Sequence, residues 1–184
     1  MTADIKRILI TTVACFVVAT SAFSIIDQDL VPLISPFFFT LLIILANLGQ
    51  VKTNKLKAVG LGLMLTLPVF FVSVLAGVGL TQIFKNGQAG MIVSSAISAG
   101  LMFLVNSLYI NMRSLKAGLG VTVVLGFVVG FIVQLIELYL PGANSLTGFI
   151  EDPGLFFICW QTLVGLGISI GIWVRVGQKM PAAG

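Results

Sequence analysis

Polar side chains inside long apolar runs are the residues of this sequence that could do chemistry. Asn47 and Asn106 lie a few residues before basic residues, and Gln134 and Gln161 lie inside two later apolar runs. Counted at about 1.5 Å of rise per residue from the basic ends, the two asparagines share one depth and the two glutamines another. Because a buried amide without a hydrogen-bond partner is destabilising, each of these layers needs partners.

Two roles for these amides remain open. They can join helices by interhelical hydrogen bonds, or they can line a pathway and bind a polar solute. On the second hypothesis, Glu137 stands one helical turn beyond Gln134 on the same face. On the same hypothesis, Arg113 lies at the cytoplasmic mouth of the pathway, where its guanidinium can bind a carboxylate through two hydrogen bonds. The candidate pathway residues are therefore Asn47, Asn106, Arg113, Gln134, Glu137 and Gln161.

Catalytic and metal chemistry have little support in the sequence. There is no histidine, which is the commonest metal ligand and the usual proton switch near neutral pH. Cys15 and Cys159 fall at different depths in their apolar runs, too far apart for a disulfide. No P-loop or nucleophile elbow is present. We therefore expect a protein that is not an enzyme and that binds no metal or cofactor.

The elements that must position these side chains are transmembrane helices. The chain of 184 residues is 58% hydrophobic and 9% charged, whereas soluble domains carry roughly 25% charged residues. Its apolar runs do not alternate with polar residues, which excludes strands of a β-barrel. We expect one all-α polytopic domain over residues 1–184, a bundle of six transmembrane helices in a lipid bilayer. The six helices are expected near residues 7–26, 31–50, 58–80, 90–112, 117–140 and 155–174.

The basic residues predict the orientation of the bundle. Every second connection is basic, and only Lys85 lies in one of the alternate connections. By the positive-inside rule, both termini are then cytoplasmic. The net charge of +4 is explained by these helix ends and does not indicate nucleic-acid binding. The basic groups are Lys6 and Arg7, then Lys52, Lys55 and Lys57, then Arg113 and Lys116, then Arg175 and Lys179.

Small residues spaced four apart predict where helices approach closely. Glycine and alanine at such positions let two backbones come together, either within one chain or between subunits. The pairs are Gly126 with Gly130, Gly167 with Gly171, and Ala96 with Gly100. Pro68, in the middle of the third run, should kink its helix.

Four stretches follow one another in a characteristic order: the proline-containing "LVPLISPFFFTLL", the basic "LGQVKTNKLKAVGLGL", the turn "NMRSLKAG" and the last run "QTLVGLGISIGIWV". This order of features resembles the six-helix membrane module of the fusaric acid resistance and aromatic acid exporter family. The resemblance implies efflux of small amphipathic or aromatic organic anions across a bacterial inner membrane. It also implies a possible periplasmic adaptor as partner, and paired or repeated copies, so that a homo-oligomer is expected.

Two other functions are compatible with the sequence. Short connections and few buried charges also suit a structural subunit that assembles with other membrane proteins. A substrate-binding component of a vitamin transporter can have six helices in a chain of this size. Those components resemble one another in an Ala-x-x-x-Ala pattern on the first helix. The pattern is absent here, because the residue four positions after Ala14 is Val18.

Overall fold

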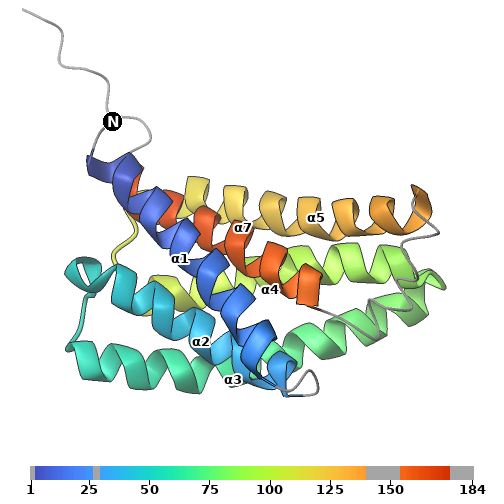
Figure 1. Cartoon of the computed structure of the whole chain (residues 1–184), viewed down its shortest axis with the longest axis horizontal. Helices are drawn as coiled ribbons and strands as arrows, with labels where there is room; N and C mark the ends of the chain where they lie inside the picture. The colour runs from blue at the N-terminus through green and yellow to red at the C-terminus, as the bar shows by residue number, and fades with distance from the viewer. Residues whose placement is uncertain (1–2, 27–29, 140–153, 175–184) are drawn as a thin grey trace, which may run out of the picture.

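The structure, a computed structural model, describes residues 3–26, 30–139 and 154–174. The regular elements of these residues are helices, so the protein is an all-α polytopic membrane protein, as the sequence predicted. The helices run roughly along the long axis of the molecule (Figure 1). They are α1 (Ala3–Ile25), α2 (Val31–Ala46), the short 3-10 helix η1 (Leu48–Gln50), α3 (Lys55–Phe84), α4 (Gly87–Tyr109), α5 (Leu115–Tyr139) and α7 (Gly154–Trp173).

Five helices are long and apolar enough to cross a membrane, namely α1, α3, α4, α5 and α7. The second predicted run, residues 31–50, forms the shorter apolar helix α2, which has 16 residues. At about 1.5 Å per residue it covers roughly 24 Å, less than the ~30 Å of a hydrocarbon core. The predicted run to residue 50 is broken at Asn47, whose backbone leaves the helical conformation (φ −123°, ψ 28°) and is followed by η1.

The helices form a ring in which each packs against the next one described. The ring closes because α7 packs against α1 as well as α5, and α7 also contacts α2 and α4 across the middle. Accordingly α7 is the most buried of the five long helices and α3 the least. Side chains on α7 are therefore the ones that meet most of the other helices.

The close approaches between helices occur at glycines. A Cβ atom added to Gly126 would lie 2.5 Å from the Cβ of Ala99, and one added to Gly167 would lie 2.5 Å from Thr122 Oγ1. The neighbour of Gly171 is Gly118, on α5. These contacts join α4 to α5 and α5 to α7, so the small-residue pairs mark packing within one chain.

Proline and asparagine residues shape the helix ends and the course of α3. The two halves of α3 run in different directions on either side of its middle, where Pro68 lies (Figure 1). A tight turn joins α3 to α4: Lys85 adopts a left-handed conformation (φ 50°), and Asn86 caps α4 by accepting hydrogen bonds from Gln88 and Ala89. Asn54 caps α3 in the same way.

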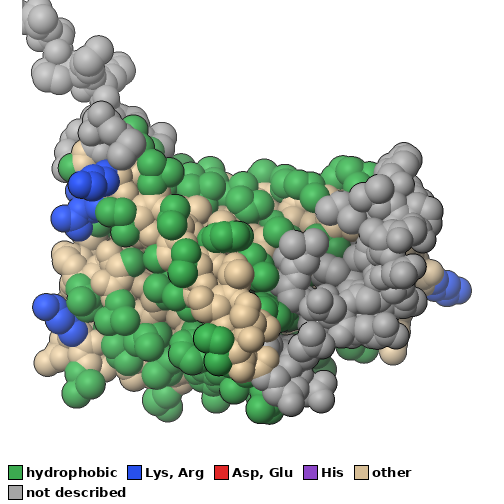
Figure 2. All heavy atoms as spheres, in the orientation of Figure 1, with side chains coloured by type: hydrophobic (Ala, Val, Ile, Leu, Met, Phe, Trp, Pro, Cys, Tyr) green, Lys and Arg blue, Asp and Glu red, His purple; other side chains and the backbone are tan. Residues whose placement is uncertain are grey.

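The basic connections gather at one end of the ring. In Figure 2, hydrophobic side chains cover the middle of the visible face, and lysine and arginine side chains lie at its ends. At the basic end, the connections after α2 and after α4 pair like two short strands. Lys52 N donates to Tyr109 O (2.9 Å), and Asn111 N donates to Gln50 O (2.8 Å). These backbone bonds tie the basic end together.

Candidate functional site

A pocket of about 220 Å³ lies between α2, α3, α4 and α7. It is in the half of the ring that lies away from the basic end, because it takes residues from the beginning of α7 and the first half of α4. Val74, which lines it, is 46% exposed on the outside of α3, so the pocket reaches the protein surface there. The lining residues are Pro36, Thr66, Val69, Phe70, Ser73, Val74, Gly77, Ser94, Ser95, Ser98, Met102, Phe156, Phe157, Trp160 and Gln161.

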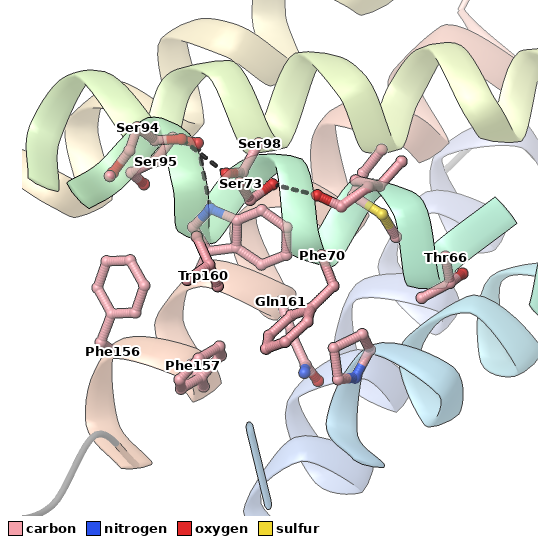
Figure 3. Close-up of a pocket in the computed structure, with 15 residues that line it drawn as sticks. Thr66, Phe70, Ser73, Ser94, Ser95, Ser98, Phe156, Phe157, Trp160 and Gln161 are labelled. Carbon is pink, nitrogen blue, oxygen red and sulfur yellow. Dashed lines mark hydrogen bonds between the residues drawn. The ribbon is translucent and has the colours of Figure 1, made fainter. Parts of the chain in front are cut away.

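Hydroxyl groups from α3 and α4 line one side of the pocket (Figure 3). Ser73 donates to Val69 O (2.7 Å), and Ser98 donates to Ser94 O (2.7 Å). Each hydroxyl has one hydrogen and two lone pairs. Since these hydrogens already serve the backbone of their own helices, the serines offer a bound molecule hydrogen-bond acceptors.

Aromatic rings form the apolar part of the pocket. Trp160 is fixed by its indole N–H, which donates to Ser95 O on α4 (3.3 Å). Its ring lies 6.1 Å from that of Phe39, and the rings of Phe156 and Phe157 meet edge to face at 5.6 Å. Rings in these arrangements present faces against which a flat apolar group can stack.

Gln161 lines the pocket from α7, and in Figure 3 its amide lies on the side away from the labelled serines. It is only 2% exposed, yet within the described part of the chain its side-chain amide has no hydrogen-bond partner. Ser35 Oγ is the fully enclosed polar atom without a partner among the described residues, so the Gln161 amide is open to the pocket, where water or a ligand can bond to it. Gln161 is therefore the residue of this pocket that most needs a bound polar molecule.

The described residues that line the pocket are uncharged. None of the 15 residues that line it is acidic or basic. Within residues 3–26, 30–139 and 154–174, no three His, Cys, Asp or Glu side chains come together to hold a metal ion. Cys15 and Cys159 are free thiols, as their separation in depth predicted. The chemistry this pocket can do is binding by hydrogen bonds and ring contacts.

Asn47 and Asn106, the predicted inner layer, do not line this pocket. Asn47, 1% exposed, accepts a hydrogen bond from Trp173 Nε1 (2.9 Å) and donates to Ile43 O (2.9 Å). Asn106, fully buried, accepts from the Tyr109 hydroxyl (3.0 Å) and donates to Met102 O (2.8 Å). Asn47 therefore joins the end of α2 to α7, which is the first of the two roles considered, whereas both hydrogen bonds of Asn106 lie within α4.

Arg113 lies at the basic end and is not among the residues that line the pocket. Its guanidinium donates to Asp4 Oδ2 (3.0 Å) and to Trp173 O (3.2 Å). The guanidinium carbons of Arg7 and Arg113 lie 4.7 Å and 5.1 Å from the centre of the Trp173 ring. We name Asp4, Arg7, Asn47, Arg113 and Trp173 the Trp173 cluster. The cluster joins α1, the end of α2, α7 and the connection between α4 and α5.

Gln134 and Glu137 belong to α5, but their side chains lie outside the described part of the structure. Of the six predicted site residues, the structure thus places Gln161 in the pocket, and Asn47 and Arg113 together in the Trp173 cluster. The pocket's serines and rings were missed. Ser94 and Ser98, one turn apart on a helix that also carries Ser95, were the signal that could have found them.

The fold is that of a polytopic all-α membrane protein, with a pocket between α2, α3, α4 and α7. A similar protein is the ribose import permease protein RbsC of Haemophilus influenzae, which is 31% identical over 156 residues, covering 79% of this chain and 46% of that protein. The chain therefore spans less than half the length of this relative. No protein-family model matches the chain. No solved structure matches it either.

Proposed function

We propose that this chain is a membrane transport module and that the serine and aromatic pocket is its solute site. The observation that carries the proposal is Gln161, a buried amide without a described partner that faces a cavity from the most enclosed helix of the ring. A pocket used only for packing would be filled or lined by apolar groups. The likeness to a permease supports the same function.

The solute and the direction of transport are finer proposals. The aromatic wall supports a small amphipathic solute, and the resemblance of the sequence to aromatic acid exporters favours efflux. The second candidate is import, because the similar protein is named for the import of ribose. Flux measured in both directions across vesicles of known orientation distinguishes the two.

Further chains are proposed as partners of the module. The chain corresponds to less than half the length of its relative. A second copy or another membrane subunit would supply the remainder. We place the assembly in a bacterial inner membrane with both termini in the cytoplasm, and a periplasmic adaptor belongs to the efflux proposal.

The test is solute flux in proteoliposomes containing the purified full chain. Wild-type protein should give saturable flux of an amphipathic solute, and Gln161→Leu should reduce that flux while the protein still inserts and unfolds at a similar temperature. Gln88→Leu is the matched control, because Gln88 is an exposed amide at the start of α4. Equal flux in wild type, both variants and empty vesicles would refute the transport proposal.

Native membranes provide a second test. If the chain copurifies in fixed stoichiometry with unrelated membrane proteins and shows no flux alone, the assembly-subunit function replaces transport. A homo-oligomer with saturable flux supports the module proposed here.

A further inference from the structure

Gln161 and the serines of the pocket together specify the chemical class of the molecule that binds there. We infer that the pocket binds an uncharged, flat aromatic molecule that carries a carboxamide or a similar group with a donor and an acceptor side by side. This inference deepens the proposed function and rests on the same pocket. It follows from four features, which are the volume, the rings, the hydrogen-bonding groups and the missing charge.

The volume and the rings set the size and shape of the ligand. A cavity of about 150 Å³ lined by apolar side chains is large enough to bind benzene. The pocket here has about 220 Å³, so a benzene ring fits with room for one polar substituent. Phe70, Phe157 and Trp160 provide the ring faces and edges that such a flat molecule would contact.

The hydrogen-bonding groups set the substituent. The Gln161 amide offers both N–H donors and a carbonyl acceptor, and it has no described partner. Ser73 and Ser98 already donate to backbone carbonyls, so they offer lone pairs alone. A primary carboxamide matches the Gln161 amide, because its carbonyl and one N–H can pair with the N–H and the carbonyl of Gln161.

The described lining residues, none of which is charged, set the charge of the ligand. An ion placed in this pocket would lose much of its hydration without gaining an opposite charge from any of the 15 lining residues. The penalty applies to anions and cations alike. The pocket should therefore discriminate against both, whereas an anion site would need a cation such as Arg113, which is engaged with Asp4 at the basic end.

Three isosteric probes test this inference without any mutation. Benzamide, benzoate and benzamidinium have nearly the same shape but are neutral, negative and positive at pH 7. In isothermal titration calorimetry of the full chain in mild detergent, corrected for titration into empty micelles, benzamide should bind at least about 100-fold more tightly than either ion. Equal affinities for benzamide and benzoate, or no binding of benzamide, would overturn the inference.

Variants of Gln161 test the assignment of the hydrogen bonds. Gln161→Leu should weaken benzamide binding about three- to tenfold and leave toluene binding unchanged or tighter, because the apolar wall is retained. Gln161→Glu should reverse the charge preference and favour benzamidinium over benzamide. Gln88→Leu, at an exposed amide outside the pocket, should change none of these affinities. Unaltered benzamide binding by both Gln161 variants would refute the inference.

The two proposals fail separately. Benzamide bound as described but not carried across proteoliposomes would end the transport proposal and leave the binding inference standing. Saturable flux of a solute, with no difference among the three probes, would support transport and end the inference about ligand class.

Discussion

Gly118 on α5 lies where two helix backbones meet, and it allows a prediction worked from the structure. A Cβ atom at this position would lie 2.5 Å from Gly171 Cα and 2.7 Å from Phe103 Cε2. Carbon atoms in optimal contact are roughly 3.5 to 4.0 Å apart, so about 1 Å of movement is required. Phe103 is fully buried and Gly171 contributes backbone, so neither can yield by a simple side-chain rotation.

Gly118→Ala should therefore destabilise the protein. Inserting atoms into a packed core typically costs about 1 to 3 kcal/mol, and backbone on one side of the contact places Gly118 at the upper end of this range. For a chain of this length, about 3 kcal/mol corresponds to a decrease in Tm of roughly 6 to 12 °C. The start of α5 is held to α7 by a hydrogen bond from Ser114 N to Gly171 O (3.1 Å), and this bond should lengthen in the variant.

Gly120, two residues further along α5, is the matched control. A Cβ atom there meets nothing within 4 Å, and the position is exposed. Gly120→Ala should be neutral or stabilising by up to about 1 kcal/mol, because alanine favours a helix over glycine. Thermal unfolding in mild detergent, followed by circular dichroism, measures both variants. The reasoning is refuted if Gly118→Ala unfolds at the wild-type temperature or if both variants lose the same stability.

Three further predictions concern the buried amide of α4, the ion pair at the basic end and the topology. Asn106→Leu leaves the Tyr109 hydroxyl buried without its acceptor, so thermal unfolding should show a loss of stability of about 1 to 3 kcal/mol. Calorimetry should show unchanged benzamide binding, and weaker binding at unchanged stability would contradict this prediction. Asp4→Asn removes a partly exposed ion pair with Arg113, so the free energy of unfolding should fall by less than about 1 kcal/mol at low salt and should not change at 1 M salt. A larger loss of stability, or one independent of salt, would contradict this prediction. A cysteine placed at Lys85, in a cysteine-free background, should react with a membrane-impermeant thiol reagent added outside intact cells; protection there would contradict cytoplasmic termini.

The helices could be predicted from sequence because the bilayer imposes a single requirement on each of them. An apolar run of about 20 residues must satisfy its backbone internally, and a helix does this regardless of its neighbours. The prediction is wrong where tertiary contacts intervene. Asn47 ends α2 early because its side chain is held by Trp173, 126 residues away, and no local pattern contains that contact.

The candidate site was predicted less well because depth alone does not say which way a side chain faces. Asn106 and Gln161 are both buried amides, but Asn106 meets Tyr109 within its own helix and Gln161 meets an open cavity. Hydroxyls such as Ser73 and Ser98 can bond to their own helix, so their presence in an apolar run does not predict a shared pocket. Which of them share a pocket depends on how α3, α4 and α7 pack, and that packing is fixed by glycines on several helices.

Gln161 and Trp173 lie on the same helix, and this connection constrains how transport would work. The two residues are about 18 Å apart along α7 at 1.5 Å per residue. The pocket around Gln161 reaches the surface, whereas the Trp173 cluster ties the basic end to α1, α2 and the connection before α5. Passage of a solute toward the basic end therefore requires that cluster to separate. Its contacts are the buried hydrogen bond from Trp173 to Asn47, the hydrogen bond from Arg113 to Trp173 O, two cation–π contacts and one partly exposed ion pair, each of about 2 kcal/mol or less. Because α7 carries a residue of each site, the transport proposal predicts that ligand binding at Gln161 loosens this cluster.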